Sequence, residues 1–189
     1  MIALIPVKPF GVAKRRLSSR FDPAQRKVLG QAIAGHTATV AAAAGIEPWI
    51  VTGSEDVARW AGERGLTVVA EDEGGGLDGA ARAGISAASG RWMVVHADLP
   101  AVVPADLAAL VDAGPTAIAP SHDGGTSAVT GESATFPFAY GPGSFHRHLS
   151  ARPNMTVVCR PGLAYDLDDT QDYDIITALE SGRWIGDVT

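Results

Sequence analysis

The chain has 189 residues, the size of one ordinary domain, with 15 Lys and Arg against 21 Asp and Glu and a formal net charge of −6. Hydrophobic residues make up 46% of the sequence and charged residues 19%, values that exclude a disordered chain and a coiled coil. No apolar run approaches the roughly 18–20 residues of a membrane span, and the start lacks the order of a signal peptide. The single cysteine, Cys159, excludes an internal disulfide and a thiolate metal cluster. We therefore expect a single cytoplasmic domain over residues 1–189.

Apolar runs and helical segments alternate over the first 120 residues. This alternation predicts an α/β fold with a mostly parallel central sheet, right-handed crossovers and flanking helices. The expected elements, in chain order, are a strand at 1–6, a helix at 23–44, a strand at 47–51, a helix at 54–64, a strand at 66–70, a helix at 78–89, a strand at 92–95, a helix at 104–113 and a strand at 116–119.

The pattern breaks in residues 121–164, which are rich in Gly, Ser, Thr, Pro and His. This small irregular excursion is expected to contain short strands in its apolar patches at 136–140 and 156–159, and a small helix near 145–149. A last strand at 164–167 and a final helix at 170–181 are expected to follow. The apolar part of the excursion could be an interface between two copies of the chain.

Cations are concentrated at the amino end. Residues 1–30 hold seven basic residues and one acidic residue, which leaves eight basic and twenty acidic residues for the remainder. Such a basic end on an acidic chain argues against a general nucleic-acid surface and is typical of a local anion site, such as one phosphate chain. Arg26 and Lys27 are expected on a solvated helix face, whereas Lys8 and Lys14 belong to the loop after the first strand.

That loop is a candidate nucleotide site, because ligands of open parallel sheets bind at the carboxyl ends of the strands. It reads PVKPFGVAKRRL from Pro6 and Val7 onward. A loop of this kind can wrap a nucleotide while Lys8 and Lys14 neutralise its phosphates. It is not the phosphate-binding loop GxxxxGK[ST], because it has no glycine-lysine-serine order.

A glycine-rich turn follows the third expected strand. Gly74, Gly76 and Gly79 match GxGxxG, which alone would suggest a dinucleotide-binding protein such as a dehydrogenase. The motif follows the third strand rather than the first, and the three carboxylates at 71–73 would repel a pyrophosphate. We therefore disfavour a nicotinamide cofactor; the glycines could instead let the backbone approach a base edge or a sugar.

Carboxylates lie at two places where strands are expected to end. Asp98 follows the fourth strand in His96-Ala97-Asp98, and residues 166–174 contain five aspartates. Asp166 and Asp168 would share one face of the expected last strand, at the same sheet edge as Asp98. Hard oxygen ligands from separate segments suit Mg²⁺ bound together with phosphates. The alternative for the last cluster is helix capping by Asp169 or Thr170 and solvation.

Two further segments offer hydroxyls and glycine amides, at 121–127 and 140–145. Ser144 would begin a short helix, where free N–H groups favour a phosphate or carboxylate of a small substrate. Turn formation and capping are the alternative. A covalent mechanism is disfavoured: Cys159 fits a core strand, His36 a structural role inside a helix, and no GxSxG elbow is present. His146 and His148 lie close enough to Ser144 in sequence to touch a substrate.

These segments together resemble the guanylyltransferases of coenzyme F420 biosynthesis, which act on 2-phospho-L-lactate in archaea and on phosphoenolpyruvate in bacteria. The likeness spans essentially the whole chain, and the ordered set is more specific than any single piece. The matching pieces are IPVKP at 5–9, AKRRL at 13–17, GGL at 75–77, ADLP at 97–100, PSHDGGT at 120–126, YGPGSF at 140–145 and DLD at 166–168. Wider relatives are nucleotidyltransferases with a Rossmann-like fold that use Mg²⁺.

The resemblance implies a role for each of thirteen residues. The acceptor acid would contact Thr126, Gly141 and Ser144; Mg²⁺ would bind Asp98, Asp166 and Asp168; GTP would be held by Pro6, Val7, Lys8, Lys14, Gly75, Gly76 and Asp78; and Lys8, Lys14 and Asp98 would act in catalysis. Asp78 stands where the family is expected to have asparagine. An acid there could accept hydrogen bonds from guanine but could not donate to its O6, so the preference for GTP is an open point.

The sequence thus predicts transfer of GMP from GTP to a small phosphorylated acid, with release of pyrophosphate and without a covalent enzyme intermediate. Phosphoenolpyruvate, 2-phospho-L-lactate and 3-phosphoglycerate are all candidate acceptors, and the product would pass to the next enzyme of the F420 pathway. Two rivals remain: a related transferase that uses CTP or another nucleotide, and a non-catalytic GTP-binding regulatory protein. The aspartates at 98, 166 and 168 argue against the second.

Overall fold

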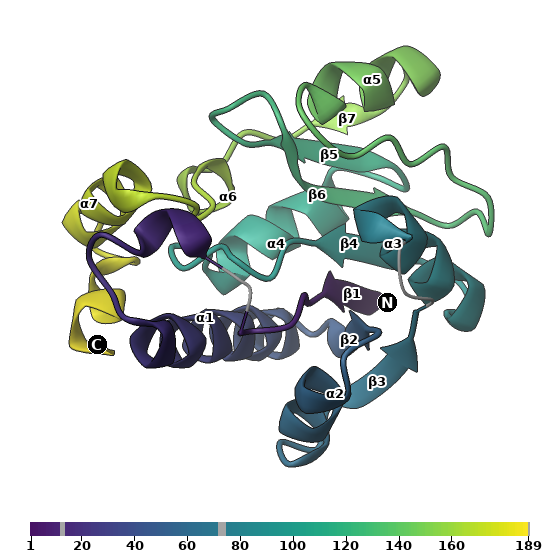
Figure 1. The fold of residues 1–189 in the computed structure, drawn as a ribbon. Helices are drawn as coiled ribbons and strands as arrows, with labels where there is room; N and C mark the ends of the chain where they lie inside the picture. The colour runs from purple at the N-terminus through teal and green to yellow at the C-terminus, as the bar shows by residue number, and fades with distance from the viewer. Residues whose placement is uncertain (12–13, 72–74, 189) are drawn as a thin grey trace.

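The computed structural model describes residues 1–11, 14–71 and 75–188. In this part of the chain, the strands form one seven-stranded sheet in the order β3-β2-β1-β4-β6-β5-β7 (Figure 1). Their bounds are β1 Ile2–Pro6, β2 Glu47–Thr52, β3 Thr67–Ala70, β4 Trp92–Val95, β5 Ala117–Pro120, β6 Thr126–Gly131 and β7 Thr156–Val157. All strand pairs are parallel except those of β6, which runs antiparallel to β4 and β5. The predicted mostly parallel α/β sheet is confirmed.

Helices cover both faces of the sheet (Figure 1). They are α1 Pro23–Ala43, α2 Glu55–Gly62, α3 Gly76–Ala87, α4 Pro104–Asp112, α5 Ser144–Ala151, α6 Pro161–Ala164 and α7 Thr170–Ala178, with 3-10 helices η1 Arg15–Leu17 and η2 Arg183–Asp187. Successive side chains of β1 point to opposite faces, as the strand period of two requires. Ala3 and Ile5 therefore join the core with α1, α2 and α4, whereas Ile2 and Leu4 join the core with α3.

The end of the chain packs beside its beginning. Leu17 of η1 and Leu29 of α1 share a buried cluster with Tyr173 and Ile176 of α7 and with Ile185 of η2. Helix α1 begins with a capping box in which the Asp22 side chain accepts a hydrogen bond from the Gln25 amide. This packing carries residues 165–169 to the loop that follows β1, which matters for the site described below.

Three expectations about the carboxyl half are wrong. The strand expected at 164–167 is absent: Ala164 is the last residue of α6, and the segment meets the sheet edge through isolated hydrogen bonds, from the His122 amide to the Ala164 carbonyl and from the Leu167 amide to the Asp98 carbonyl. Residues 136–140 alternate like a strand but pair with none; Phe136 and Phe138 instead pack on Trp92. Cys159 lies beyond β7 and is exposed, not part of the core. The predicted small helix is present as α5.

The apolar excursion offers little exposed apolar surface. Among the described residues, the exposed large hydrophobic side chains are Val28 and Val157. The suggestion of an interface between two copies therefore stays a prediction, for which sedimentation is the test. In the described part of the chain, no helix has both the length and the apolar character needed to cross a membrane.

Candidate active site

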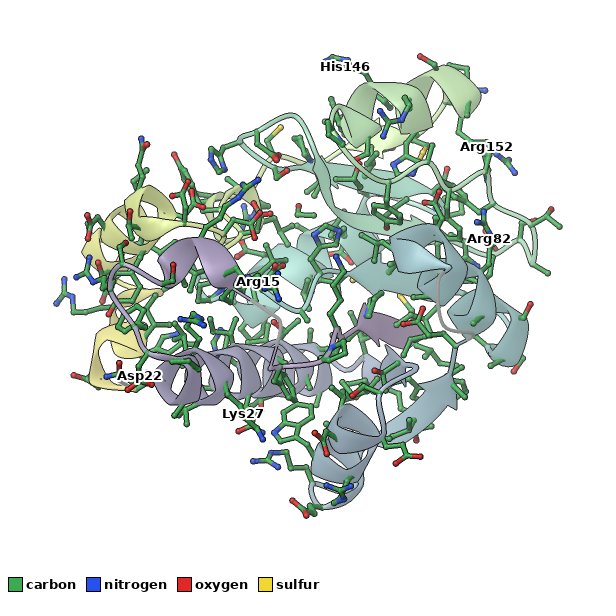
Figure 2. All side chains as sticks on the ribbon, viewed as in Figure 1. Arg15, Asp22, Lys27, Arg82, His146 and Arg152 are labelled. Carbon is green, nitrogen blue, oxygen red and sulfur yellow. The ribbon has the colours of Figure 1, made fainter. Side chains whose placement is uncertain are left out.

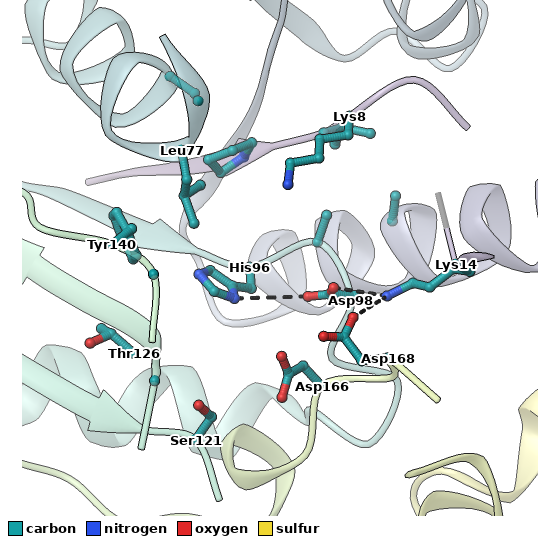
Figure 3. A pocket seen from close by; sticks show the side chains of 18 of the residues that line it. Lys8, Lys14, Leu77, His96, Asp98, Ser121, Thr126, Tyr140, Asp166 and Asp168 are labelled. Atoms are coloured by element: carbon teal, nitrogen blue, oxygen red, sulfur yellow. Dashed lines mark hydrogen bonds and ion pairs between the residues drawn. The ribbon is translucent and has the colours of Figure 1, made fainter. Parts of the chain in front are cut away.

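A cavity of about 620 Å³ opens at the edge of the sheet where the parallel strands end (Figure 3). Eleven of the thirteen predicted site residues line it: Pro6, Val7, Lys8, Lys14, Gly76, Asp98, Thr126, Gly141, Ser144, Asp166 and Asp168. Gly75 and Asp78 do not. Gly74 of the glycine-rich motif lies outside the described residues. The structure thus brings together residues that are up to 162 positions apart in sequence, counted from Pro6 to Asp168.

The strand directions explain this convergence. β1 and β4 are parallel neighbours, so the loops that contain Lys8 and Asp98 leave the sheet at the same edge. β6 is antiparallel to β4, so its first residue, Thr126, rather than its last, lies at that edge. β6, the antiparallel strand, therefore contributes the Thr126 hydroxyl at the edge where the parallel strands end.

Lys14 joins the loop after β1 to the carboxylates. Its Nζ atom lies 2.8 Å from Oδ2 of Asp98 and 3.8 Å from Oδ1 of Asp168, and it also donates to the Leu167 carbonyl. Lys14 has a φ of 58°, a left-handed conformation that is rare for a residue with a side chain. Burial alone would raise the pKa of Asp98, but the Lys14 charge, His96 and the Lys14 hydrogen bond together lower it.

The five aspartates of residues 166–174 divide into two groups. Asp169 caps α7 by accepting from the amides of Gln171 and Asp172, as the capping alternative foresaw. Asp172 accepts from the amides of Asp168 and Asp169, and Asp174 forms an ion pair with Arg20. Only the remaining pair, Asp166 and Asp168, lines the cavity.

Three side chains could hold a metal ion together. His96, Asp98 and Asp166 each offer one ligand atom, and these atoms lie within 4.8 Å of one another. Burial, with the neighbouring charges of Asp98 and Asp168, raises the pKa of Asp166 to about 7. Such crowded carboxylates fit a divalent cation, because the cation offsets their mutual repulsion. The third possible ligand within this distance is therefore His96, whereas the sequence predicted Asp168.

A second group of polar residues lies across the cavity from Lys14 (Figure 3). Ser144 Oγ donates to Thr126 Oγ1 at 3.3 Å. Gly141 has a φ of +108°, a conformation that favours glycine. Ser144 is the first residue of α5, as predicted, but its amide already donates to the Gly141 carbonyl, and the next amide donates to the Gly124 carbonyl. An anion here would therefore depend on the hydroxyls more than on the first amides of the helix.

Two side chains, Asp78 and Arg147, hold the loop between Ala139 and Gly143. The Tyr140 amide donates to Oδ1 of Asp78 at 2.8 Å. Arg147 donates to the carbonyls of Ala139, Tyr140 and Pro142. Oδ1 of Asp78 is thus engaged by this loop, whereas Oδ2 is not.

A family of known transferases matches this chain. The family model described as "Guanylyl transferase CofC like" matches residues 1–176. The chain belongs to this family.

Members of the CofC-like family resemble the chain over most of its length. A phosphoenolpyruvate guanylyltransferase of Rubrobacter xylanophilus is 34% identical over 91% of each chain. A 2-phospho-L-lactate guanylyltransferase of Methanothermobacter thermautotrophicus is 28% identical over 78% of this chain and 69% of its own. The resemblance inferred from the motifs is therefore confirmed.

Solved structures share the fold at low identity. A proposed nucleotide-diphospho-sugar transferase from Desulfovibrio desulfuricans G20 has a TM-score of 0.74 at 16% identity, covering 97% of this chain and 89% of its own. A CMP:2-keto-3-deoxy-manno-octonic acid synthetase solved with CTP has a TM-score of 0.59 at 14% identity, covering 96% and 98%. These likenesses confirm the nucleotidyltransferase fold of this CofC-like chain.

Several cavity residues were not singled out from the sequence. Two of them, His96 and Tyr140, have polar atoms, Nε2 and the hydroxyl, that are buried and have no hydrogen-bond partner among the described residues. Burial lowers the pKa of His96 and raises that of Tyr140, so both are neutral near pH 7. Orphaned polar atoms in a cavity are ready to bond a ligand. The position of His96, two residues before Asp98 at a strand end, was the available signal.

The other histidines near or beside the site lie outside the cavity lining. His146 is exposed on the outer side of α5 (Figure 2). His36 is part-buried in α1 and bonds the Val102 carbonyl through Nε2, which confirms its structural role. His148 is fully buried behind Thr126, so the suggestion that His146 and His148 touch substrate is wrong for both.

Proposed function

We propose that the chain is a guanylyltransferase that transfers GMP from GTP to phosphoenolpyruvate or 2-phospho-L-lactate, within coenzyme F420 biosynthesis. The observation that carries the proposal is the cavity itself. In a chain of the CofC-like family, it places Lys14 and three aspartates opposite Thr126 and Ser144. A polyphosphate and a small anionic acceptor would then lie side by side, as in-line transfer requires.

The reaction needs no covalent enzyme intermediate. A phosphate oxygen of the acceptor attacks the α-phosphorus of GTP; the new P–O bond forms as the bond to the β-phosphate oxygen breaks, and pyrophosphate leaves with that bond's electron pair. Lys8, which is exposed at the cavity, and Lys14 offset the negative charge that develops on the phosphates. The backbone at Pro6, Val7 and Gly76, which line the cavity, is proposed to hold the nucleotide, with Gly75 next to Gly76 in the same turn.

Asp98, Asp166 and Asp168 are the proposed ligands of Mg²⁺, with His96 as a further donor within reach of the first two. Bound Mg²⁺ would neutralise phosphate charge and orient the reacting groups. In the absence of a cation, Lys14 supplies the positive charge that this carboxylate cluster requires.

The acceptor is proposed to lie against Thr126, Gly141 and Ser144. The left-handed backbone at Gly141 shapes the loop, and both hydroxyl-bearing residues are almost fully buried, at 1% and 2% exposure. The product, a guanylylated acid, would pass to the next enzyme of the pathway.

Pyrophosphate release tests the proposal. GTP and Mg²⁺ are incubated with phosphoenolpyruvate, 2-phospho-L-lactate or 3-phosphoglycerate separately, and CTP, ATP and UTP replace GTP in parallel. A strong signal for GTP with one of the first two acids supports the proposal and identifies the acceptor. Release with CTP alone points to the related transferase, and binding of GTP without release with any acid points to the regulatory protein.

A further inference from the structure

His148 is buried behind Thr126, and both of its ring nitrogens have partners. Its exposure is 0%. The amide of Ala139 donates to Nε2 at 2.9 Å, and Nδ1 lies 3.0 Å from Oγ1 of Thr126. An imidazole nitrogen that accepts a hydrogen bond from an amide carries no proton. Nε2 is therefore bare, and the ring proton of neutral His148 must lie on Nδ1.

This tautomer fixes the direction of the next hydrogen bond. Nδ1–H of His148 donates to Oγ1 of Thr126, and Ser144 Oγ donates to the same oxygen. A hydroxyl has two lone pairs and one proton. Both lone pairs of Thr126 are thus engaged, and its own O–H has no acceptor among the described residues.

The hydroxyl proton of Thr126 can be donated only towards the cavity. Thr126 and Ser144 line the cavity, whereas His148 lies behind them. Because the O–H of Thr126 has no acceptor among the described residues, it can bond only a cavity ligand or water. As a donor it selects an acceptor oxygen, most strongly an anionic one. Burial keeps His148 neutral by lowering its pKa to about 4, against a smaller opposing effect of Asp78.

We propose that His148 is a positioning residue that fixes Thr126 as an obligatory hydrogen-bond donor to an anionic oxygen of the acceptor substrate. The inference rests on the proposed function for the identity of that acceptor. It does not make His148 an acid or a base, because the ring never exchanges a proton with the substrate. The anionic oxygen belongs to the phosphate or to the carboxylate of the acceptor.

The tautomer can be measured without any substrate. In uniformly ¹⁵N-labelled protein at pH 7, long-range ¹H–¹⁵N correlation spectra distinguish a protonated ring nitrogen from a bare one. We expect one histidine, assigned to position 148 by its loss in His148→Gln, to show a protonated Nδ1 and a bare Nε2. A protonated Nε2, or a doubly protonated ring, would overturn the proposal whether or not the protein turns over substrate.

Two substitutions separate the two hydrogen bonds of His148. Glutamine places its amide near the position of Nε2, so His148→Gln keeps an acceptor for Ala139 but loses the donor to Thr126. Asparagine places its amide near Nδ1, so His148→Asn keeps the donor. We expect His148→Gln to raise the KM of the acceptor about 10- to 100-fold, with a much smaller rise for His148→Asn and little change in the KM of GTP. His146→Gln, on the exposed side of the same helix, is the matched control.

A double-mutant cycle completes the test. Thr126→Val removes the hydroxyl at nearly constant shape, so His148→Gln should raise the acceptor KM no further in that background. Equal effects of His148→Gln in both backgrounds, or a parallel fall in kcat and rise in both KM values, would show a merely structural role and overturn the proposal. To identify the bonded oxygen, inorganic phosphate and pyruvate are compared as competitive inhibitors. The one whose inhibition weakens in Thr126→Val carries it.

A wild-type protein that releases no pyrophosphate with any acceptor contradicts the proposed function. The ¹⁵N measurement then decides the hydrogen-bond direction alone, so the two failures are distinguishable.

Discussion

Lys14 and Asp98 form an ion pair of 2.8 Å at the edge of the sheet, with only 7% of the lysine side chain exposed. The pair links the loop after β1 to the loop after β4, and Asp168 lies 3.8 Å from the same ammonium. One lysine therefore connects the proposed phosphate-binding loop with the proposed metal ligands. A residue placed between two parts of a site should affect activity more than folding.

Lys14→Ala tests that expectation. Loss of the ammonium removes the positive charge that stabilises the negative charge developing on the phosphates in the transition state, so we expect kcat to fall about 10²- to 10³-fold. Asp98 stays 30% exposed and keeps partial hydration, so the melting temperature should fall by only a few degrees. Lys27→Ala on the exposed outer side of α1 is the control and should change neither quantity (Figure 2). Turnover and stability that fall to the same extent would contradict the catalytic role.

Asp166→Asn should make the cation-free protein more stable in a pH-dependent way. The pKa of Asp166 is raised from 3.8 to about 7, so the folded protein holds this proton more tightly than the unfolded chain. The stability that the protonated form provides is present below about pH 4 and is lost as the pH rises to about 7. Asparagine cannot ionise, so the variant should melt several degrees above wild type at pH 8, with a much smaller difference at pH 4.5, in buffers with chelator.

The control for this prediction is the addition of Mg²⁺ at pH 8. The cation should raise the melting temperature of wild type more than that of Asp166→Asn, because it offsets the same repulsion among the carboxylates. A melting-temperature difference that is independent of pH, or a Mg²⁺ effect of equal size in both proteins, would argue against Asp166 as a ligand.

Gly141→Ala should weaken acceptor binding selectively. A residue with a side chain is strained at the φ of +108° that Gly141 adopts, so the loop beside Thr126 and Ser144 should shift. We expect the acceptor KM to rise at least about tenfold while the KM of GTP changes little. Gly45→Ala is a matched control, since Gly45 has a φ of +74° and does not line the cavity. It should lower stability and leave both KM values unchanged; an unchanged acceptor KM in Gly141→Ala would refute the assignment.

Asp78 offers a test of where the nucleotide base is read. Oδ1 of Asp78 accepts from the Tyr140 amide, and an asparagine would retain this acceptor. We therefore expect Asp78→Asn to leave both KM values within about threefold of wild type. Asp78→Leu should raise the acceptor KM about 3- to 10-fold by leaving the amide unpaired. Arg82→Ala on the same helix is the exposed control. A large change in the KM of GTP for Asp78→Asn would show instead that this side chain contacts the base.

The sequence allowed the parallel half of the fold to be predicted, because its signals are local. Short apolar runs, one ending at Pro6 and one beginning soon after Gly90, indicated β1 and β4, and hence the positions of Lys8 and Asp98. β6 was not predicted: Thr126–Gly131 consists mostly of small and hydroxyl residues, and its strand character depends on its neighbours β4 and β5. Such tertiary dependence is typical of strands.

Site residues that belong to local sequence motifs could be predicted, whereas those that are brought to the site by tertiary packing could not. Asp166 and Asp168 line the cavity as predicted, yet they reach it on an irregular segment held by the Asp172 carboxylate, not on a strand. The burial of His96 Nε2 without a partner and the hydrogen bonds of His148 depend on the tertiary structure, so no local sequence pattern predicts them.

The most direct test of guanylyl transfer is to identify the product. The protein is incubated with GTP, Mg²⁺ and either phosphoenolpyruvate or 2-phospho-L-lactate, and the mixture is analysed by mass spectrometry and ³¹P NMR, with Lys14→Ala in parallel. The account predicts one new species in which GMP and the acceptor share a diphosphate bond, formed in equal amount with pyrophosphate and almost absent with Lys14→Ala. Tight GTP binding with neither product nor pyrophosphate for either acid would contradict it.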